Sequence, residues 1–149
     1  MAATPWLLGC CSALKHRRGQ RQVEEFIDII EELCAKIRYY KLPLGEIYAD
    51  LKLMQLKEFC RDLSEMSFGD ALLKNRKEIM VGDRCFECLQ SFASELGRSG
   101  SEEQVRNCEA TLEALKKERD RLHTEVPKQM KVSLSLGGMT GAMIFLLLL

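Results

Sequence analysis

The sequence predicts an all-α protein, a small helical bundle followed by an apolar C-terminal helix. Three observations support this fold class. Apolar residues in the middle of the 149-residue chain recur every three or four positions, which is typical of amphipathic helices. The chain holds only three prolines, and 30% of its residues are charged, which favours helices in a leucine-rich sequence. No run of alternating apolar and polar residues indicates a β-strand.

The charges are balanced overall but are unevenly distributed along the chain. There are 22 basic and 22 acidic residues, and no acidic residue precedes Glu24 or follows Glu125. Six basic residues lie outside that interval: Lys15, Arg17, Arg18, Arg21, Lys128 and Lys131. The middle of the chain is therefore acidic, with a basic collar at each end. Since no excess of positive charge is available to pair with phosphates, the composition argues against a nucleic-acid partner.

The C-terminal segment, residues 132–149, carries no charge. As a helix it would extend about 27 Å, close to the ~30 Å hydrocarbon core of a bilayer. This predicts a transmembrane helix; the alternative is a buried core helix, for which a small domain has little room. Gly137 and Gly141 lie on one face of this helix and would allow close packing against the N-terminal segment or another subunit.

Residues 1–14 are also uncharged, but a helix of this length reaches only about 21 Å. They are either a short membrane anchor or an interfacial segment with Trp6 at the headgroups. Positive charges mark the cytoplasmic side of a membrane segment, and both collars face the middle of the chain. We therefore predict a short anchor at 1–14, a cytoplasmic helical bundle at 15–131 and a transmembrane helix at 132–149.

The first amphipathic helix is predicted from Gln22 to Tyr40. Its apolar positions are Val23, Phe26, Ile27, Ile30, Leu33, Cys34 and Ile37. Pro43 ends it, because the residue before a proline avoids the α region, and then opens a short second helix through Ile47 and Leu51.

Four further helices are predicted in the remainder of the middle segment. One covers residues 53–66, and the next opens at Phe68 or Asp70. Another follows a cap at Asp83 and ends at Gly97. Ser101 and Gln104 have the spacing of a capping box for the last helix. Its heptad positions are Val105, Cys108, Leu112, Leu115, Leu122 and Val126, with Arg119 as the polar exception.

No motif in the chain indicates catalysis, a cofactor, a metal or a small-molecule substrate. Cys85 and Cys88 form a CxxC, but no strand precedes them as in redox proteins, and no second ligand pair would complete a zinc site. Core packing is the preferred interpretation of both cysteines. His123 is interpreted as a solvated helix position, since no nucleophile is evident beside it.

Acidic residues of the first helix form a candidate partner face. Glu24 and Glu25, and one helical repeat later Glu31 and Glu32, are either ordinary solvated helix surface or part of a docking surface.

Three segments carry a family resemblance. They contain Tyr40, Pro43, Leu44 and Glu46; Leu96, Gly97, Ser99 and Gln104; and Leu136, Gly137 and Gly141. In order and spacing they resemble the stage III sporulation protein AB family of endospore-forming Firmicutes over nearly all of the chain. Gly100 departs from the family pattern, which usually has Asp after the serine, so the helix cap is expected at Ser99 or Ser101.

The resemblance implies a fold similar to the cytoplasmic domain of type II secretion F proteins. It implies a location in the mother-cell membrane around the forespore, with the soluble domain in the cytoplasm. The implied partners are membrane lipid, a secretion-type cytoplasmic ATPase and the other membrane proteins of the sporulation channel operon.

We therefore expect a non-enzymatic assembly component of the channel complex that docks the ATPase. The alternative is a membrane-linked helical signalling or dimerisation module that uses the heptad of the last helix. A redox enzyme based on Cys85 and Cys88 is a third hypothesis.

Overall fold

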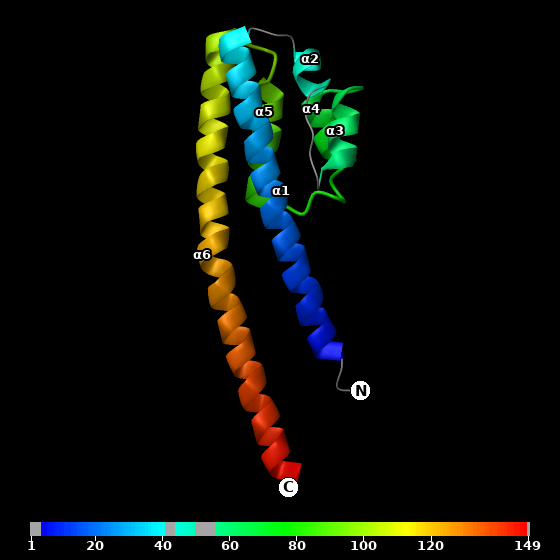
Figure 1. Cartoon of the computed structure of the whole chain (residues 1–149), viewed down its shortest axis with the longest axis vertical. Coiled ribbons are helices and arrows are strands. Elements are labelled where there is room, and N and C mark those ends of the chain that lie inside the picture. The colour runs from blue at the N-terminus through cyan, green and yellow to red at the C-terminus, as the bar shows by residue number, and fades with distance from the viewer. Residues whose placement is uncertain (1–3, 41–43, 50–55, 149) are drawn as a thin grey trace.

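The computed structural model describes the backbone of residues 4–40, 44–49 and 56–148, and side chains within residues 14–124 of those ranges. Every regular element in these ranges is a helix, which confirms the all-α fold class. The helices are α1 (Thr4–Tyr40), α2 (Leu44–Ala49), α3 (Lys57–Leu63), α4 (Phe68–Lys74), α5 (Asp83–Glu95) and α6 (Ser101–Leu148). The long helices α1 and α6 run antiparallel, and α2–α5 pack beside the upper part of this pair (Figure 1).

The α1–α6 pair is held by a buried seam and by regularly spaced ion pairs. Cys108 and Leu115 of α6 are fully buried, and Val105, Leu112 and Leu122 are partly buried against the core, as the predicted heptad requires. Val126, the last predicted position, lies outside the residues whose side chains are described. Among the described residues, Arg38 pairs with Glu109 and Glu31 with Lys116 at 2.6 Å across the seam, and His123 Nε2 lies 3.6 Å from Glu24 Oε1. Successive partners lie seven residues apart on both helices, which is the register of an antiparallel heptad repeat.

A chain of aromatic rings joins the short helices to α1. Phe26 of α1 contacts Phe59 of α3, which contacts Phe68 of α4, which contacts Phe92 of α5, with ring centroids 5.2–5.5 Å apart. All three contacts are edge-to-face, the arrangement that the quadrupole of aromatic rings favours. The four rings are almost completely buried, so they form the centre of the hydrophobic core.

A buried carboxylate fixes α4 against α3. Asp62 is 3% exposed and accepts hydrogen bonds from Lys74 Nζ and from Asn75 Nδ2, both at 2.8 Å. The hydrogen bond from Lys74 and then that from Asn75 stabilise the charged form and lower the pKa of Asp62. Asn75 also donates to the carbonyl of Ala71, so every polar atom in this small network has a partner.

Several predicted helix boundaries agree with the structure and others do not. The first helix ends at Tyr40 as predicted but begins at Thr4 rather than Gln22, because residues 14–18 are exposed and give no amphipathic signal. Phe68 opens α4, with Ser67 as its cap. The 53–66 helix is shorter than predicted in its described part, from Lys57 to Leu63. Asp83 is the first residue of α5 rather than its cap; Gly82 occupies the capping position.

Among the residues that the structure describes, no helix contains a stretch long and apolar enough to span a membrane. The side chains of residues 1–13 and 132–149 lie outside the described set. The predictions that concern Pro43, and the surroundings of Gly137 and Gly141, also lie outside it.

Candidate functional site

Two of the three motif segments meet at one end of the bundle, which we call the distal end. It is formed by the last turn of α1, the start of α2 and the turn between α5 and α6. A Cβ atom placed on Gly97 would lie 3.6 Å from Cδ1 of Leu44, so the α5–α6 turn packs directly on the first residue of α2. Residues that are more than fifty positions apart in the sequence therefore share one small region.

The α5–α6 turn depends on the conformation of Gly97. The N–H of Leu96 still bonds to the carbonyl of Phe92, and Gly97 then takes φ = +82°. This left-handed conformation ends α5 in the way that glycine allows at low cost. The predicted helix end at Gly97 is confirmed.

The start of α6 differs from the predicted capping box. Ser101 is the first helical residue, and the N–H of Gln104 bonds to the carbonyl of Gly100 at 3.0 Å. The Gln104 side chain instead donates to the carbonyl of Ser99 at 2.7 Å. Gly100 can occupy the capping position without a side-chain bond, so Gln104 stabilises the preceding turn.

Two adjacent tyrosines are exposed at the distal end. Tyr39 is 73% exposed and Tyr40 is 70% exposed, although both follow the well-buried Ile37. At the same end of the bundle lies a hollow of about 320 Å³, lined by residues of α1 and α6: Ile37, Arg38, Ser101, Glu102 and Val105. The ion pair between Arg38 and Glu109 lies next to this hollow.

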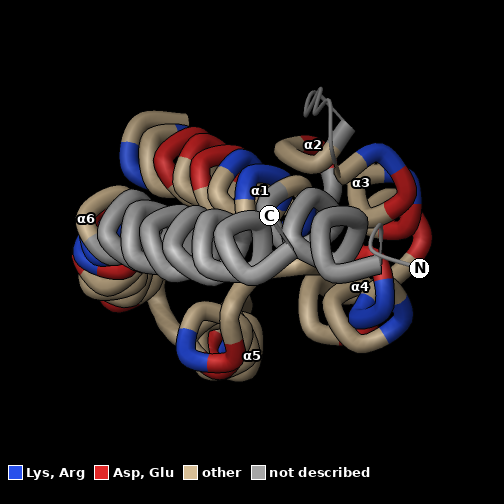
Figure 2. The backbone as a smooth tube through the Cα atoms, turned by 90° about the horizontal axis from the view of Figure 1, so that it is seen from below, with Lys and Arg blue, Asp and Glu red and all other residues tan. Residues whose placement is uncertain are grey.

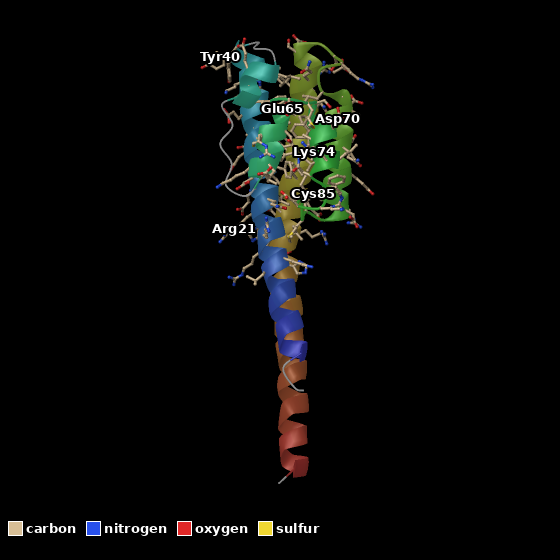
Figure 3. All side chains as sticks on the ribbon, turned by 90° about the vertical axis from the view of Figure 1, so that its right-hand side faces the viewer. Arg21, Tyr40, Glu65, Asp70, Lys74 and Cys85 are labelled. Carbon is tan, nitrogen blue, oxygen red and sulfur yellow. The ribbon has the colours of Figure 1, made fainter. Side chains whose placement is uncertain are left out.

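The distal end and the N-terminal basic collar (Lys15, Arg17, Arg18 and Arg21) lie at opposite ends of the bundle. Figure 3 shows Tyr40 at the top of the helical body and Arg21 near its lower boundary, with α1 and α6 continuing beyond. Figure 2 shows the acidic stretch of α1 between basic residues, in agreement with the charge order of the sequence.

The four acidic residues of the predicted partner face do not form one free surface. Glu24 and Glu31 pair with His123 and Lys116 of α6. Glu32 pairs with Lys36 on α1 at 3.0 Å.

Glu25 accepts a hydrogen bond from the backbone N–H of Leu56, just before α3. Asp28 lies between Glu24 and Glu31 in the sequence. Burial, followed by the charges of Glu31 and Glu24, raises the pKa of Asp28. These carboxylates therefore already act within the protein, as partners of its own helices.

Cys85 of the CxxC belongs to the core, whereas Cys88 is only half-buried. Cys85 is 2% exposed, and burial raises its pKa to about 12; burial also raises the pKa of Cys88. A thiolate is the reactive form of cysteine, so these environments oppose redox or nucleophilic chemistry. Within the described residues, no group of three or more His, Cys, Asp or Glu side chains is placed to hold a metal ion.

Sequence reasoning missed one polar residue that shapes the lower end of the bundle. Gln22 is completely buried; its side chain donates to the carbonyl of Glu78 at 2.9 Å and accepts from the N–H of Met80 at 2.6 Å. Three residues earlier, a Cβ on Gly19 would lie 2.6 Å from the carbonyl oxygen of Met80. Both residues are on the core-facing side of α1, and this spacing is the only signal in the sequence.

Comparison with known proteins identifies the family to which the motif residues of the distal end belong. A model of the family described as stage III sporulation protein AB (spore_III_AB) matches residues 1–149. The chain belongs to the stage III sporulation protein AB family. This confirms the family to which Leu44, Gly97 and Gln104 pointed in the sequence. The searches of curated proteins and of solved structures returned no match. The similarity of this AB-family chain to type II secretion F proteins stays a prediction.

Proposed function

We propose that this AB-family protein is a non-enzymatic, membrane-anchored assembly component of the sporulation channel complex between mother cell and forespore. In this proposal its distal end docks the cytoplasmic secretion-type ATPase of the complex. The observation that carries the proposal is the exposed pair Tyr39 and Tyr40 at the end of the bundle that has the hollow, opposite the N-terminal basic collar.

The exposure of these tyrosines is unusual for this molecule. The other aromatic residues whose side chains are described are buried: Phe26, Tyr48, Phe59, Phe68, Phe86 and Phe92. Tyrosine is enriched among the residues that dominate binding energy at protein interfaces, because it combines a large apolar surface with a polar tip. Among the described residues, this exposed tyrosine pair is therefore the best candidate for a contact with another protein.

Membrane anchoring rests on the sequence at the other end of the bundle. Both basic collars lie directly inside the uncharged segments 1–14 and 132–149, which is the charge order expected for a cytoplasmic domain between two membrane segments. From Arg21 to Tyr40, α1 extends about 28 Å, so the tyrosines would stand well away from the headgroups and within reach of a cytoplasmic protein.

Two earlier hypotheses receive less support than distal docking. Reversing Glu24, Glu25, Glu31 and Glu32 would break contacts inside the protein, so lost binding would not locate a docking face. Self-dimerisation through the heptad of α6 would require residues such as Cys108 and Leu115, which already pack on α1.

The proposal is tested by capture of the operon's ATPase on the full chain held in detergent micelles. We expect Tyr39→Ala with Tyr40→Ala to weaken the affinity at least tenfold, as for central interface tyrosines. The matched control is Leu73→Ala, which shortens another large apolar side chain that is 57% exposed, on α4. Equal affinity of both variants would defeat distal docking, and no capture by the native chain would defeat ATPase recruitment.

A further inference from the structure

The segment of α1 just below the bundle is surrounded by solvent. Five consecutive residues, 14–18, are all exposed, and burial on α1 begins only at Gly19. Successive residues of an α-helix differ by about 100° in direction, so five exposed residues in a row leave no side of the helix covered. Among the residues whose side chains the structure describes, none packs on this segment closely enough to bury one of its side chains.

This exposed segment carries unpaired positive charge. Lys15, Arg17, Arg18 and Arg21 make no ion pair in the part of the chain that the structure describes, whereas Lys36, Lys74 and Lys116 all pair with carboxylates. No acidic residue precedes Glu24 in the sequence. Arg21 lies three and four positions after Arg18 and Arg17, a spacing at which like charges on a helix repel. The arrangement costs stability unless an anionic partner is present.

Three of the four cations share one face of the helix. Arg17, Arg18 and Arg21 lie within about 100° of one another around the axis, and Lys15 projects to the side opposite Arg17. A lipid headgroup layer surrounds a helix that enters a membrane, so it can meet both Lys15 and the three arginines. Leu14, next to Lys15, is 67% exposed and begins the uncharged run toward the N-terminus, so charge and apolar surface follow each other along the axis. The acidic remainder of the chain would repel a nucleic acid.

We propose that Lys15, Arg17, Arg18 and Arg21 of α1 form a binding site for the headgroup phosphates of anionic phospholipids. This inference rests on the proposed membrane anchoring and adds the lipid class to it. Arginine binds phosphate through its planar fork of N–H donors, and cationic residues near an anionic surface attract it within a Debye length. The site gathers anionic lipid around α1 and sets the depth at which the bundle stands on the membrane.

Trp6 provides the probe, because it is the only tryptophan of the chain and lies on α1 about 13 Å before Lys15. The full chain is reconstituted in phosphatidylcholine vesicles that contain a trace of lipid with a pyrene-labelled acyl chain. The labelled lipid is either phosphatidylglycerol or phosphatidylcholine. The ratio of energy transfer from Trp6 to these two lipids measures the enrichment of anionic lipid around the helix.

We expect a ratio on the order of two or more at low salt, falling toward one in high salt. Arg17→Gln, Arg18→Gln and Arg21→Gln together should bring it to one. The matched control removes three exposed cations from the bundle, Lys57→Gln, Lys77→Gln and Arg98→Gln, and should leave the ratio unchanged.

A ratio of one for the native chain, or an equal fall in the control, overturns the lipid site while membrane anchoring stands. A chain that does not float with any vesicles overturns the anchoring itself. A ratio of one combined with loss of ATPase capture in the arginine variant would make the segment a protein-docking surface instead.

Discussion

At the scale of single residues, two glycines show how backbone conformation decides the effect of the same added atom. A Cβ on Gly97 would lie 3.6 Å from Cδ1 of Leu44, and a Cβ on Gly69 would lie 3.6 Å from the Cβ of Ala93. Both are ordinary contacts. Gly97 has φ = +82°, whereas Gly69 lies within helix α4. The room for an added Cβ atom is equal at the two glycines, so the two positions differ only in backbone conformation.

We expect Gly97→Ala to destabilise the protein by about 1–2 kcal/mol, because a left-handed conformation opposes a side chain. This corresponds to a fall in Tm of roughly 3–6 °C. Gly69→Ala should leave Tm unchanged or raise it, since alanine favours a helix. Thermal unfolding of the full chain in detergent, followed by circular dichroism, measures both. Equal changes in Tm would contradict the role given to the backbone of Gly97.

At the scale of helices, local signals in the sequence were sufficient where one residue determines a boundary. Tyr40 ends α1 ahead of a proline, Phe68 opens α4, and Gly97 ends α5. The capping box at Ser101 was wrong, because Gly100 can hold the capping position and Gln104 bonds backwards to Ser99. Short-range rules name the residues near a helix end but not which of them the tertiary structure uses.

Contacts between distant segments could not be read from the sequence. Gln22 appeared as the polar start of a helix, yet it is completely buried because the loop at Met80 crosses α1 there. Likewise the acidic partner face was reasonable on α1 alone, but α6 supplies Lys116 and His123 opposite Glu31 and Glu24. The distal site was predicted only as separate motifs; their meeting depends on how α1, α2 and α5 pack.

Two carboxyl groups should give the helices opposite pH responses. The pKa of Asp62 is lowered by its bonds from Lys74 and Asn75, so its contribution to stability is complete above the unfolded pKa near 3.8 and is lost as pH falls through the folded pKa. Asp62→Asn should therefore lower the free energy of unfolding at pH 7. The stability of this variant should also fall less steeply than that of the native chain as the pH drops below 3.8. The pKa of Asp28 is raised by burial and by Glu31 and Glu24, so stability falls as pH rises past 3.8.

Asp28→Asn should accordingly raise stability at pH 7 and have little effect below pH 3. Unfolding by urea between pH 2.5 and 7, with both variants and the native chain, checks the two signs. If both substitutions changed the free energy of unfolding at pH 7 in the same direction, the causes given for the two pKa shifts would be wrong.

At the scale of the whole molecule, the protein is a rod with a different surface at each end. The distal end offers Tyr39 and Tyr40, and the lower end of the bundle offers four cations that pair with no carboxylate among the described residues. The charged contacts along the α1–α6 seam lie between these surfaces. Exposed pairs of this kind contribute little stability singly, about 0–1 kcal/mol each.

The pairing across the seam is tested by exchanging one charge pair. Glu31→Lys alone and Lys116→Glu alone each place like charges opposite one another and should cost about 0.5–1 kcal/mol. The exchange of both should recover most of the loss, with a coupling near 1 kcal/mol at low salt. High salt should reduce the coupling. If the double variant lost as much free energy of unfolding in urea as the two single variants together, Glu31 and Lys116 would not interact.

The order of the charges along the seam has a mechanical consequence. If α6 slid by one heptad, about 10.5 Å, toward one end, Glu31 would face Glu109; in the opposite direction Arg38 would face Lys116. Either displacement replaces an attraction with a repulsion, so only one alignment of the two helices satisfies all their charges. The charge order therefore adds to the buried seam in opposing a slide of α6 along α1. A force applied by a partner at the tyrosines would reach the collar as a displacement of the whole rod.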